Sequence, residues 1–187
     1  LHAGFREVKI EGGQLLVNGQ PVLIKGANRH EMDPDGGYVV SEERMIEDIR
    51  ILKENNFNAV RTCHYPDDAR WYALCDRYGL YLVAEANLES HGMGYDEKTL
   101  AKNPAYAQAH LERNIRNVQR NINHPSVIVW SLGNEAGDGP NFDACYDWIK
   151  AYDPSRPVHY ERAVYNNGGR NTDIVCPMYW DYDQCEK

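Results

Sequence analysis

Residues 80–86 read LYLVAEA, and polar residues follow directly at Asn87 and Glu89. A run of seven residues that is almost entirely apolar is typical of a strand in a sheet covered on both faces. Comparable segments, some of them shorter, recur at residues 22–28, 58–62, 127–132, 157–160 and 173–176. The sequence therefore predicts six buried strands.

Segments with helical spacing separate these strands. Ser41 precedes one of them, in which Met45, Ile49 and Leu52 fall on one face of a helix. Further helices are expected at residues 67–78, which Gly79 closes, and at residues 105–121 and 141–152. Strands that alternate with amphipathic helices predict parallel βα units.

The first residues have a different pattern. Residues 5–10 alternate between apolar and polar side chains, and residues 14–17 form a second apolar run before Asn18 and Gly19. This pattern predicts a short antiparallel ribbon with a tight turn. We expect residues 1–20 to form a β-ribbon that leads into a partial barrel domain at residues 21–187.

Polar side chains follow the predicted strands at their C-terminal ends, where a (β/α)₈ barrel gathers its active face. A doubly wound sheet places its site at the same edge but usually offers a glycine-rich phosphate loop. The Gly12-Gly13 and Gly36-Gly37 pairs lack the spacing and the following helix of such a loop. We expect an α/β fold, a (β/α)₈ TIM barrel truncated to roughly its first six βα units.

The composition excludes several classes of partner. Of 187 residues, 42% are hydrophobic and 26% charged, which is ordinary for a globular domain. A net charge of -8 argues against nucleic acid and anionic membranes, and no apolar run is long enough to span a bilayer. The five cysteines are expected to be free thiols. The chain begins without Met, so we expect a piece of a longer protein, with the cytoplasm favoured and the periplasm or secretion left open.

The sharpest local motif is WSLGNE at residues 130–135. It delivers an amide, Asn134, and a carboxyl group, Glu135, at the end of an apolar strand. Such a carboxylic acid can protonate a departing sugar oxygen while the amide holds a sugar hydroxyl. The alternative is that Glu135 only caps the following turn.

Residues 124–135, HPSVIVWSLGNE, resemble the acid/base motif of glycoside hydrolase family 2, and most closely that of its bacterial β-galactosidases. Other segments resemble that family's barrel in the same order: residues 28–31, 57–61, 64–66, 71–81 and 176–179. The resemblance implies a retaining glycoside hydrolase that cleaves terminal β-D-galactosides.

The resemblance also implies roles for single residues. Glu135 matches the general acid/base. The ligands of an active-site Mg²⁺ match Glu89, His91 and Glu135, and oxygen ligands suit this hard cation. Zinc is the competing ion, but no set of thiolates stands nearby in the sequence. The residues expected to contact the sugar or line its site are His30, His64, Asn134, Arg61 and Tyr179, with Trp180 as a further candidate.

The resemblance leaves alternatives open. A retaining enzyme needs a second carboxylate as nucleophile, and the family carries it on a seventh strand, which we expect to lie beyond Lys187. The isolated chain is therefore expected to be inactive, and it could act as a folding or carbohydrate-binding piece. A β-glucuronidase or β-mannosidase is the other possibility for the parent protein, which we expect to be a homo-oligomer.

Overall fold

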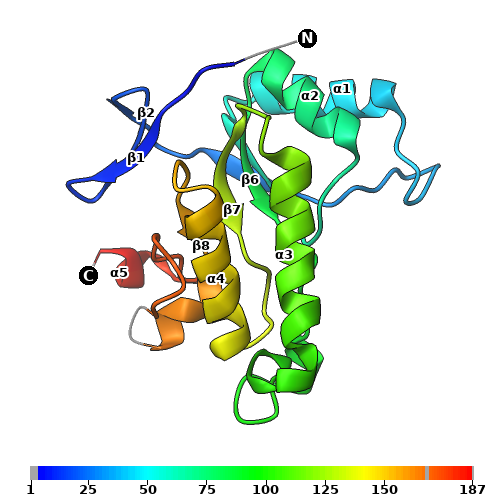
Figure 1. Ribbon diagram of the computed structural model, residues 1–187. Helices are drawn as coiled ribbons and strands as arrows, with labels where there is room; N and C mark the ends of the chain where they lie inside the picture. The colour runs from blue at the N-terminus through cyan, green and yellow to red at the C-terminus, as the bar shows by residue number, and fades with distance from the viewer. Residues whose placement is uncertain (1–3, 167–168, 187) are drawn as a thin grey trace.

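The structure is a computed structural model that describes residues 4–166 and 169–186. A parallel sheet of five strands in the order β4-β5-β6-β7-β8 forms its centre (Figure 1). The strands are β4 (Gly26–Arg29), β5 (Ala59–Thr62), β6 (Tyr81–Glu85), β7 (Val127–Ser131) and β8 (Val158–His159). Arg29 pairs with Thr62, and Glu85 with Ser131, so the C-terminal ends of the strands meet at one edge.

Helices connect successive strands, as the sequence predicts. They are α1 (Glu42–Glu54), α2 (Ala69–Tyr78), α3 (Ala107–Asn121) and α4 (Pro140–Tyr152). Ser41 caps α1 by accepting the Arg44 N–H, and Asp68 caps α2 in the same way. Gly79 ends α2 with a φ of 73°, a left-handed conformation that glycine adopts without a steric penalty.

The main apolar core lies between the sheet and the helices. Leu82 of β6 and Trp130 of β7 pack there with Trp71 of α2 and Phe142 of α4, and each is fully buried. Burying one such side chain stabilises the fold by roughly 1.5–3 kcal/mol. This layer therefore fixes the strands and, with them, the positions of their polar ends.

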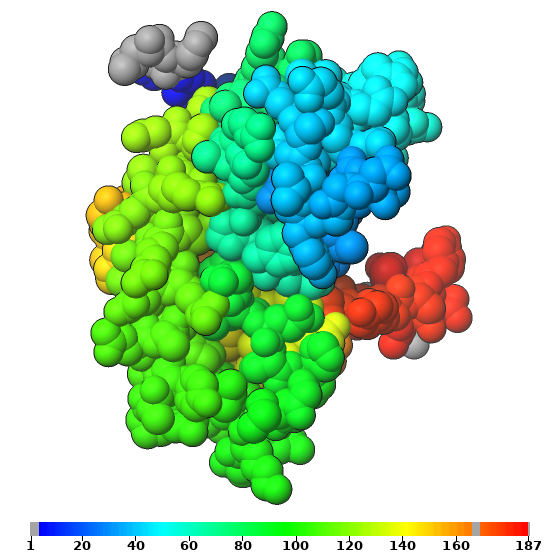
Figure 2. Space-filling view, turned by 90° about the vertical axis from the view of Figure 1, so that its right-hand side faces the viewer, coloured from blue at the N-terminus to red at the C-terminus, as the bar shows by residue number. Residues whose placement is uncertain are grey.

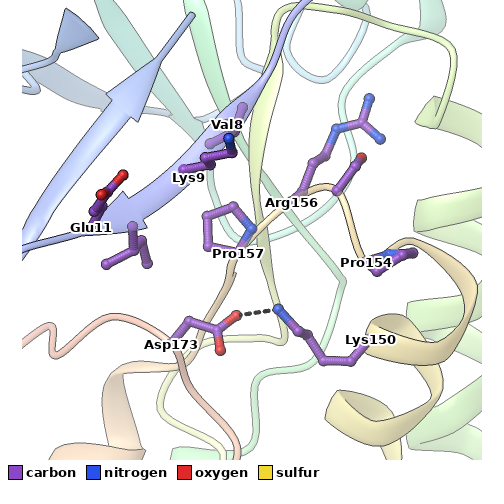
Figure 3. Close-up of a pocket in the computed structure, with 10 residues that line it drawn as sticks. Val8, Lys9, Glu11, Lys150, Pro154, Arg156, Pro157 and Asp173 are labelled. Atoms are coloured by element: carbon purple, nitrogen blue, oxygen red, sulfur yellow. Dashed lines mark hydrogen bonds and ion pairs between the residues drawn. The ribbon is translucent and has the colours of Figure 1, made fainter. Parts of the chain in front are cut away.

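The antiparallel ribbon covers part of the opposite face of the sheet. It consists of β1 (Val8–Glu11), β2 (Gln14–Val17) and β3 (Gln20–Pro21), and its Val8 and Val17 pack on Ile128 and Val129 of β7. A groove of about 520 Å³ separates β1 from the α4–β8 corner. In Figure 3, Lys150 and Asp173 form an ion pair of 2.9 Å at this groove, which ties the end of α4 to the segment after β8.

The prediction of a sixth strand at residues 173–176 is wrong. Only Ile174 forms an isolated bridge there, with His159. The Asp173 carboxylate accepts the Val158 N–H at 2.8 Å and the Lys150 ammonium at 2.9 Å, which bends the segment out of a regular ladder. The first predicted strand is also shorter than residues 22–28, because Lys25 donates its N–H to the Asn58 side chain and pairing starts at Gly26.

The long connection at residues 87–103 contains two 3₁₀ turns, His91–Met93 and Leu100–Lys102, and a third at Pro104–Tyr106 leads into α3. The C-terminal segment with α5 (Tyr182–Cys185) stands out from the body of the molecule (Figure 2). Within residues 4–166 and 169–186, every helix is too short or too polar to cross a bilayer. The five cysteines are free, as expected, and Cys63, Cys75 and Cys145 are buried.

Candidate active site

A buried carboxylate, Glu85, lies at the centre of the strand ends. It is inaccessible to solvent and accepts hydrogen bonds from Arg61 Nε at 2.6 Å and from Ser131 Oγ at 2.6 Å. His64 Nδ1 lies 2.8 Å from its other oxygen. Because a buried charge needs a counter-charge and satisfied lone pairs, this arrangement explains why a Glu is tolerated inside the sheet.

The Asn134 amide is held on both sides. Its carbonyl oxygen accepts from Arg61 Nη2 at 2.9 Å, and its amide nitrogen donates to Glu89 Oε1 at 2.9 Å. Its backbone N–H donates to the Leu88 carbonyl at 2.8 Å, so the segment after β7 runs beside the segment after β6. The site residues Arg61, Asn134 and Glu89 are therefore in one network.

Glu135 stands in an unusual backbone conformation with a φ of 42°. The preceding Gly133 has a φ of 157°, and a Cβ there would lie 2.6 Å from the Leu88 carbonyl oxygen, so only glycine fits. The Glu135 carboxylate accepts from the hydroxyls of Tyr95 at 3.1 Å and Tyr179 at 3.4 Å. Its side chain is 20% exposed.

The alternative that Glu135 merely caps a turn has no support in these contacts. Helix α4 begins after Gly139, with Pro140 in its first turn and no side-chain cap. The carboxylate of Glu135 instead points toward two phenols and His91 Nδ1, which is 3.9 Å away. It is partly shielded from water and remains reachable by a ligand.

Glu161, which sequence reasoning missed, accepts the Glu135 backbone N–H at 2.7 Å and so holds its left-handed turn. The side chain is 1% exposed, and burial raises its pKa to about 7. Its second oxygen has no hydrogen-bond partner among the described residues. The available signal was its place directly after the predicted strand at residues 157–160, at the same edge as the other strand ends. Its contact with the Glu135 backbone could not be read from the sequence.

The three residues expected to bind Mg²⁺ lie close to one another. His91 Nδ1 is 3.6 Å from Glu89 Oε1 and 3.9 Å from Glu135 Oε2. Two carboxylates and one imidazole suit a hard cation that keeps several waters. The ligand atoms of Glu89, His91 and Glu135 do not all lie within 4.8 Å of one another. In the described part of the chain, only those of His30, Cys63 and His64 do.

His30 and His64, expected to contact the sugar, lie side by side with ring centroids 5.3 Å apart. His30 is exposed and His64 is held by Glu85. Beneath them, burial raises the pKa of the Cys63 thiol to about 11, so the sulfur is neutral near pH 7. Tyr179 is 90% exposed and Trp180 46%, so the segment that carries them is the least enclosed part of the site.

A cavity of about 1040 Å³ runs along the inner face of the sheet, from Ile10 and Leu15 of the ribbon past Val60, Val83 and Val129 to the strand ends. There it is lined by the predicted residues Arg61, His64, Asn134, Glu135 and Tyr179. Its lining includes Glu161 and does not include His30, Glu89 or His91. A parallel βα sheet whose C-terminal edge carries a carboxyl group, an amide and histidines around one cavity is the arrangement of a (β/α)₈ barrel enzyme.

A family model described as "Glycosyl hydrolases family 2, TIM barrel domain" matches residues 8–187. The chain belongs to glycoside hydrolase family 2, and the predicted fold class, a partial TIM barrel, is confirmed.

Solved structures similar to this chain are described as β-glucuronidases. The enzyme of Dictyoglomus thermophilum is 30% identical, with a TM-score of 0.80 over 97% of this chain and 34% of that one. The Ruminococcus gnavus enzyme in complex with D-glucuronic acid is 29% identical, with a TM-score of 0.79 over 94% of this chain and 30% of that one. This chain thus spans about a third of their length. Their names describe β-glucuronidases, whereas the sequence motifs resemble the β-galactosidases of the same family.

Proposed function

We propose that this chain supplies the acid/base half of the active site of a retaining β-glycosidase, with Glu135 as the general acid and base. The observation that carries the proposal is the placement of the Glu135 carboxyl. Glu135 has a left-handed backbone that the Glu161 carboxylate holds, and its carboxyl lines the cavity at the strand ends, where it is 20% exposed beside two phenols.

In the first step, the Glu135 carboxylic acid donates its proton to the glycosidic oxygen as the bond to the sugar breaks. In the second, the resulting carboxylate takes a proton from the attacking water. Asn134 would hold a sugar hydroxyl beside the reacting carbon, since its amide is already fixed by Arg61 and Glu89.

The nucleophile must be a second carboxylate about 5–5.5 Å from the first. The nearby carboxylates of the described residues have other tasks: Glu85 neutralises Arg61, Glu89 holds Asn134, and Glu161 holds the Glu135 backbone. We therefore expect the nucleophile to come from outside residues 1–187, and we expect no turnover from the 187-residue chain alone.

Mg²⁺ would be held by Glu89, His91 and Glu135, after small rotations of the two exposed side chains, Glu89 and His91. When bound, the cation supplies positive charge beside the acid/base carboxyl. Its presence in the working enzyme is part of the proposal. Assembly of the parent protein into a homo-oligomer is a further expectation.

One candidate sugar is a terminal β-D-galactoside. The segments around His30, His64 and Glu135 that resemble the β-galactosidases support it.

A β-glucuronide is the other candidate, and it is the one that the names of the similar structures favour. A uronate needs a cation, and Arg162 is close to the site. Its guanidinium lies 3.7 Å from the ring centre of Tyr95, and the Tyr95 hydroxyl donates to Glu135. A uronate carboxylate reaching toward Tyr95 would therefore meet a positive charge.

Initial rates of the full gene product on p-nitrophenyl β-galactoside, β-glucuronide and β-mannoside test the proposal. We expect hydrolysis of one of them with retention of anomeric configuration. An Arg162→Gln variant separates the sugars, since it should lower kcat/KM for the glucuronide and leave the galactoside rate nearly unchanged. Inversion of configuration, or no hydrolysis of any β-glycoside, would contradict the assignment.

A further inference from the structure

Three ligand atoms, one each from His30, Cys63 and His64, lie within 4.8 Å of one another at the ends of two neighbouring strands. We propose that this cluster is a binding site for a soft divalent cation such as Zn²⁺, separate from the carboxylate-rich Mg²⁺ position.

The strand register brings the cluster together. His30 follows β4, while Cys63 and His64 follow β5. Arg29 pairs with Thr62, and the Cys63 N–H donates to the Arg29 carbonyl at 3.1 Å. The backbone around two of the three ligands is therefore fixed before any cation arrives.

The ligand types select the metal. Two imidazole nitrogens and one thiolate are a common zinc set, with bonds of about 2.0–2.1 Å to nitrogen and about 2.3 Å to sulfur. Tetrahedral geometry at those lengths puts the ligand atoms roughly 3.3–3.6 Å apart. The 4.8 Å limit therefore requires closure by up to about 1.5 Å. Rotation of the exposed His30 side chain can bring its nitrogen closer, while the Cys63 and His64 atoms must approach by small shifts of their own side chains. Mg²⁺ avoids thiolate and would not compete.

A buried carboxylate prepares one of the ligands. Glu85 Oε1 lies 2.8 Å from His64 Nδ1. A carboxylate in this position accepts a proton-bearing Nδ1, and Nε2 is then the nitrogen that can bind the metal. A carboxylate behind a ligating histidine fixes its tautomer and strengthens it as a donor. On binding, the Cys63 S–H proton is released to solvent and the thiolate takes its place in the first coordination sphere.

Of the three residues, His64 lines the cavity that reaches the strand ends. If the proposed function holds, the cation and the sugar would exclude each other, because both use His30 and His64. Cation binding itself does not depend on the proposed function, so the test below measures binding alone.

Titration of the purified chain with Co²⁺, which reports thiolate ligation by a near-ultraviolet charge-transfer band, tests the site. We expect one equivalent bound, with the band lost in Cys63→Ser and affinity reduced by about tenfold or more in His30→Ala. His30 is exposed, so that variant leaves the core intact. Cys185→Ser, at an exposed cysteine, is the matched control and should keep the band.

Three results of the Co²⁺ titrations would overturn the proposal. They are the absence of a thiolate band at saturating Co²⁺, a band that survives in Cys63→Ser, and a His30→Ala variant that binds Co²⁺ as tightly as the wild-type chain. Excess Mg²⁺ should leave the band in place, and its displacement by Mg²⁺ would equally contradict a soft-metal site.

Discussion

Replacing Glu85 by Gln removes one negative charge from the centre of the strand-end network without changing its shape. The carboxylate is fully buried. It accepts hydrogen bonds from Arg61 and Ser131 at 2.6 Å each, and His64 Nδ1 lies 2.8 Å from it. A Gln side chain has one acceptor oxygen, and its amide nitrogen would face one of these three donors. Arg61 would keep its charge but lose its buried counter-ion.

Breaking a buried ion pair by removing one partner costs roughly 3–5 kcal/mol. Arg61 is 16% exposed and also donates to Asn134, so part of its charge remains solvated. We therefore expect a loss near the lower limit, about 3 kcal/mol, which for a chain of this size lowers Tm by roughly 6–12 °C.

The measurement is urea unfolding of the wild type and of Glu85→Gln, followed by circular dichroism, with equal m-values required for comparison. Glu54→Gln is the matched control. Glu54 is 58% exposed and pairs with Arg50 across one helical turn, so the control should lose at most about 0.5 kcal/mol. If Glu85→Gln loses less than about 1 kcal/mol, the network does not hold the strand ends in the way described.

Three further outcomes can be measured. Burial lowers the pKa of His159 from 6.5 to about 4, so between these pH values the unfolded chain binds a proton and the native chain does not. The free energy of unfolding should therefore fall by up to roughly 3 kcal/mol as the pH drops from about 6.5 to 4. His159→Gln should remove that part of the pH dependence. Gly133→Ala should destabilise the chain by at least about 2 kcal/mol in thermal unfolding, because its Cβ would meet the Leu88 carbonyl at 2.6 Å. His91→Ala should weaken Mg²⁺ binding by calorimetry roughly tenfold or more, and unchanged affinity would remove His91 from the ligand set.

Much of the fold follows from local patterns. The apolar runs place β5, β6 and β7 nearly at their observed limits. Ser41 marks the start of α1 and Gly79 the end of α2, because capping depends on residues adjacent in the sequence. The strand predicted at residues 173–176 is absent because the Asp173 carboxylate accepts the backbone N–H of Val158. Val158 is far from Asp173 in the sequence, so this contact cannot be read from the local pattern.

The candidate site divides in the same way. Glu135 and Asn134 are visible in the sequence because they follow a long apolar strand. The supporting roles of Glu85 and Glu161 are not, since they depend on which strand ends come into register. The same applies to the meeting of His30 with Cys63, which are 33 positions apart in the chain but adjacent across β4 and β5.

The role of Glu135 as general acid is tested most directly by the dependence of rate on the leaving group. Glu135→Gln in the full gene product should lose roughly 10²–10⁴-fold in kcat/KM on a β-glycoside of an alkyl alcohol, whose departing oxygen needs a proton. A dinitrophenyl glycoside of the same sugar, which leaves without protonation, should lose far less. Equal losses on both substrates would contradict the assignment of Glu135 as the acid.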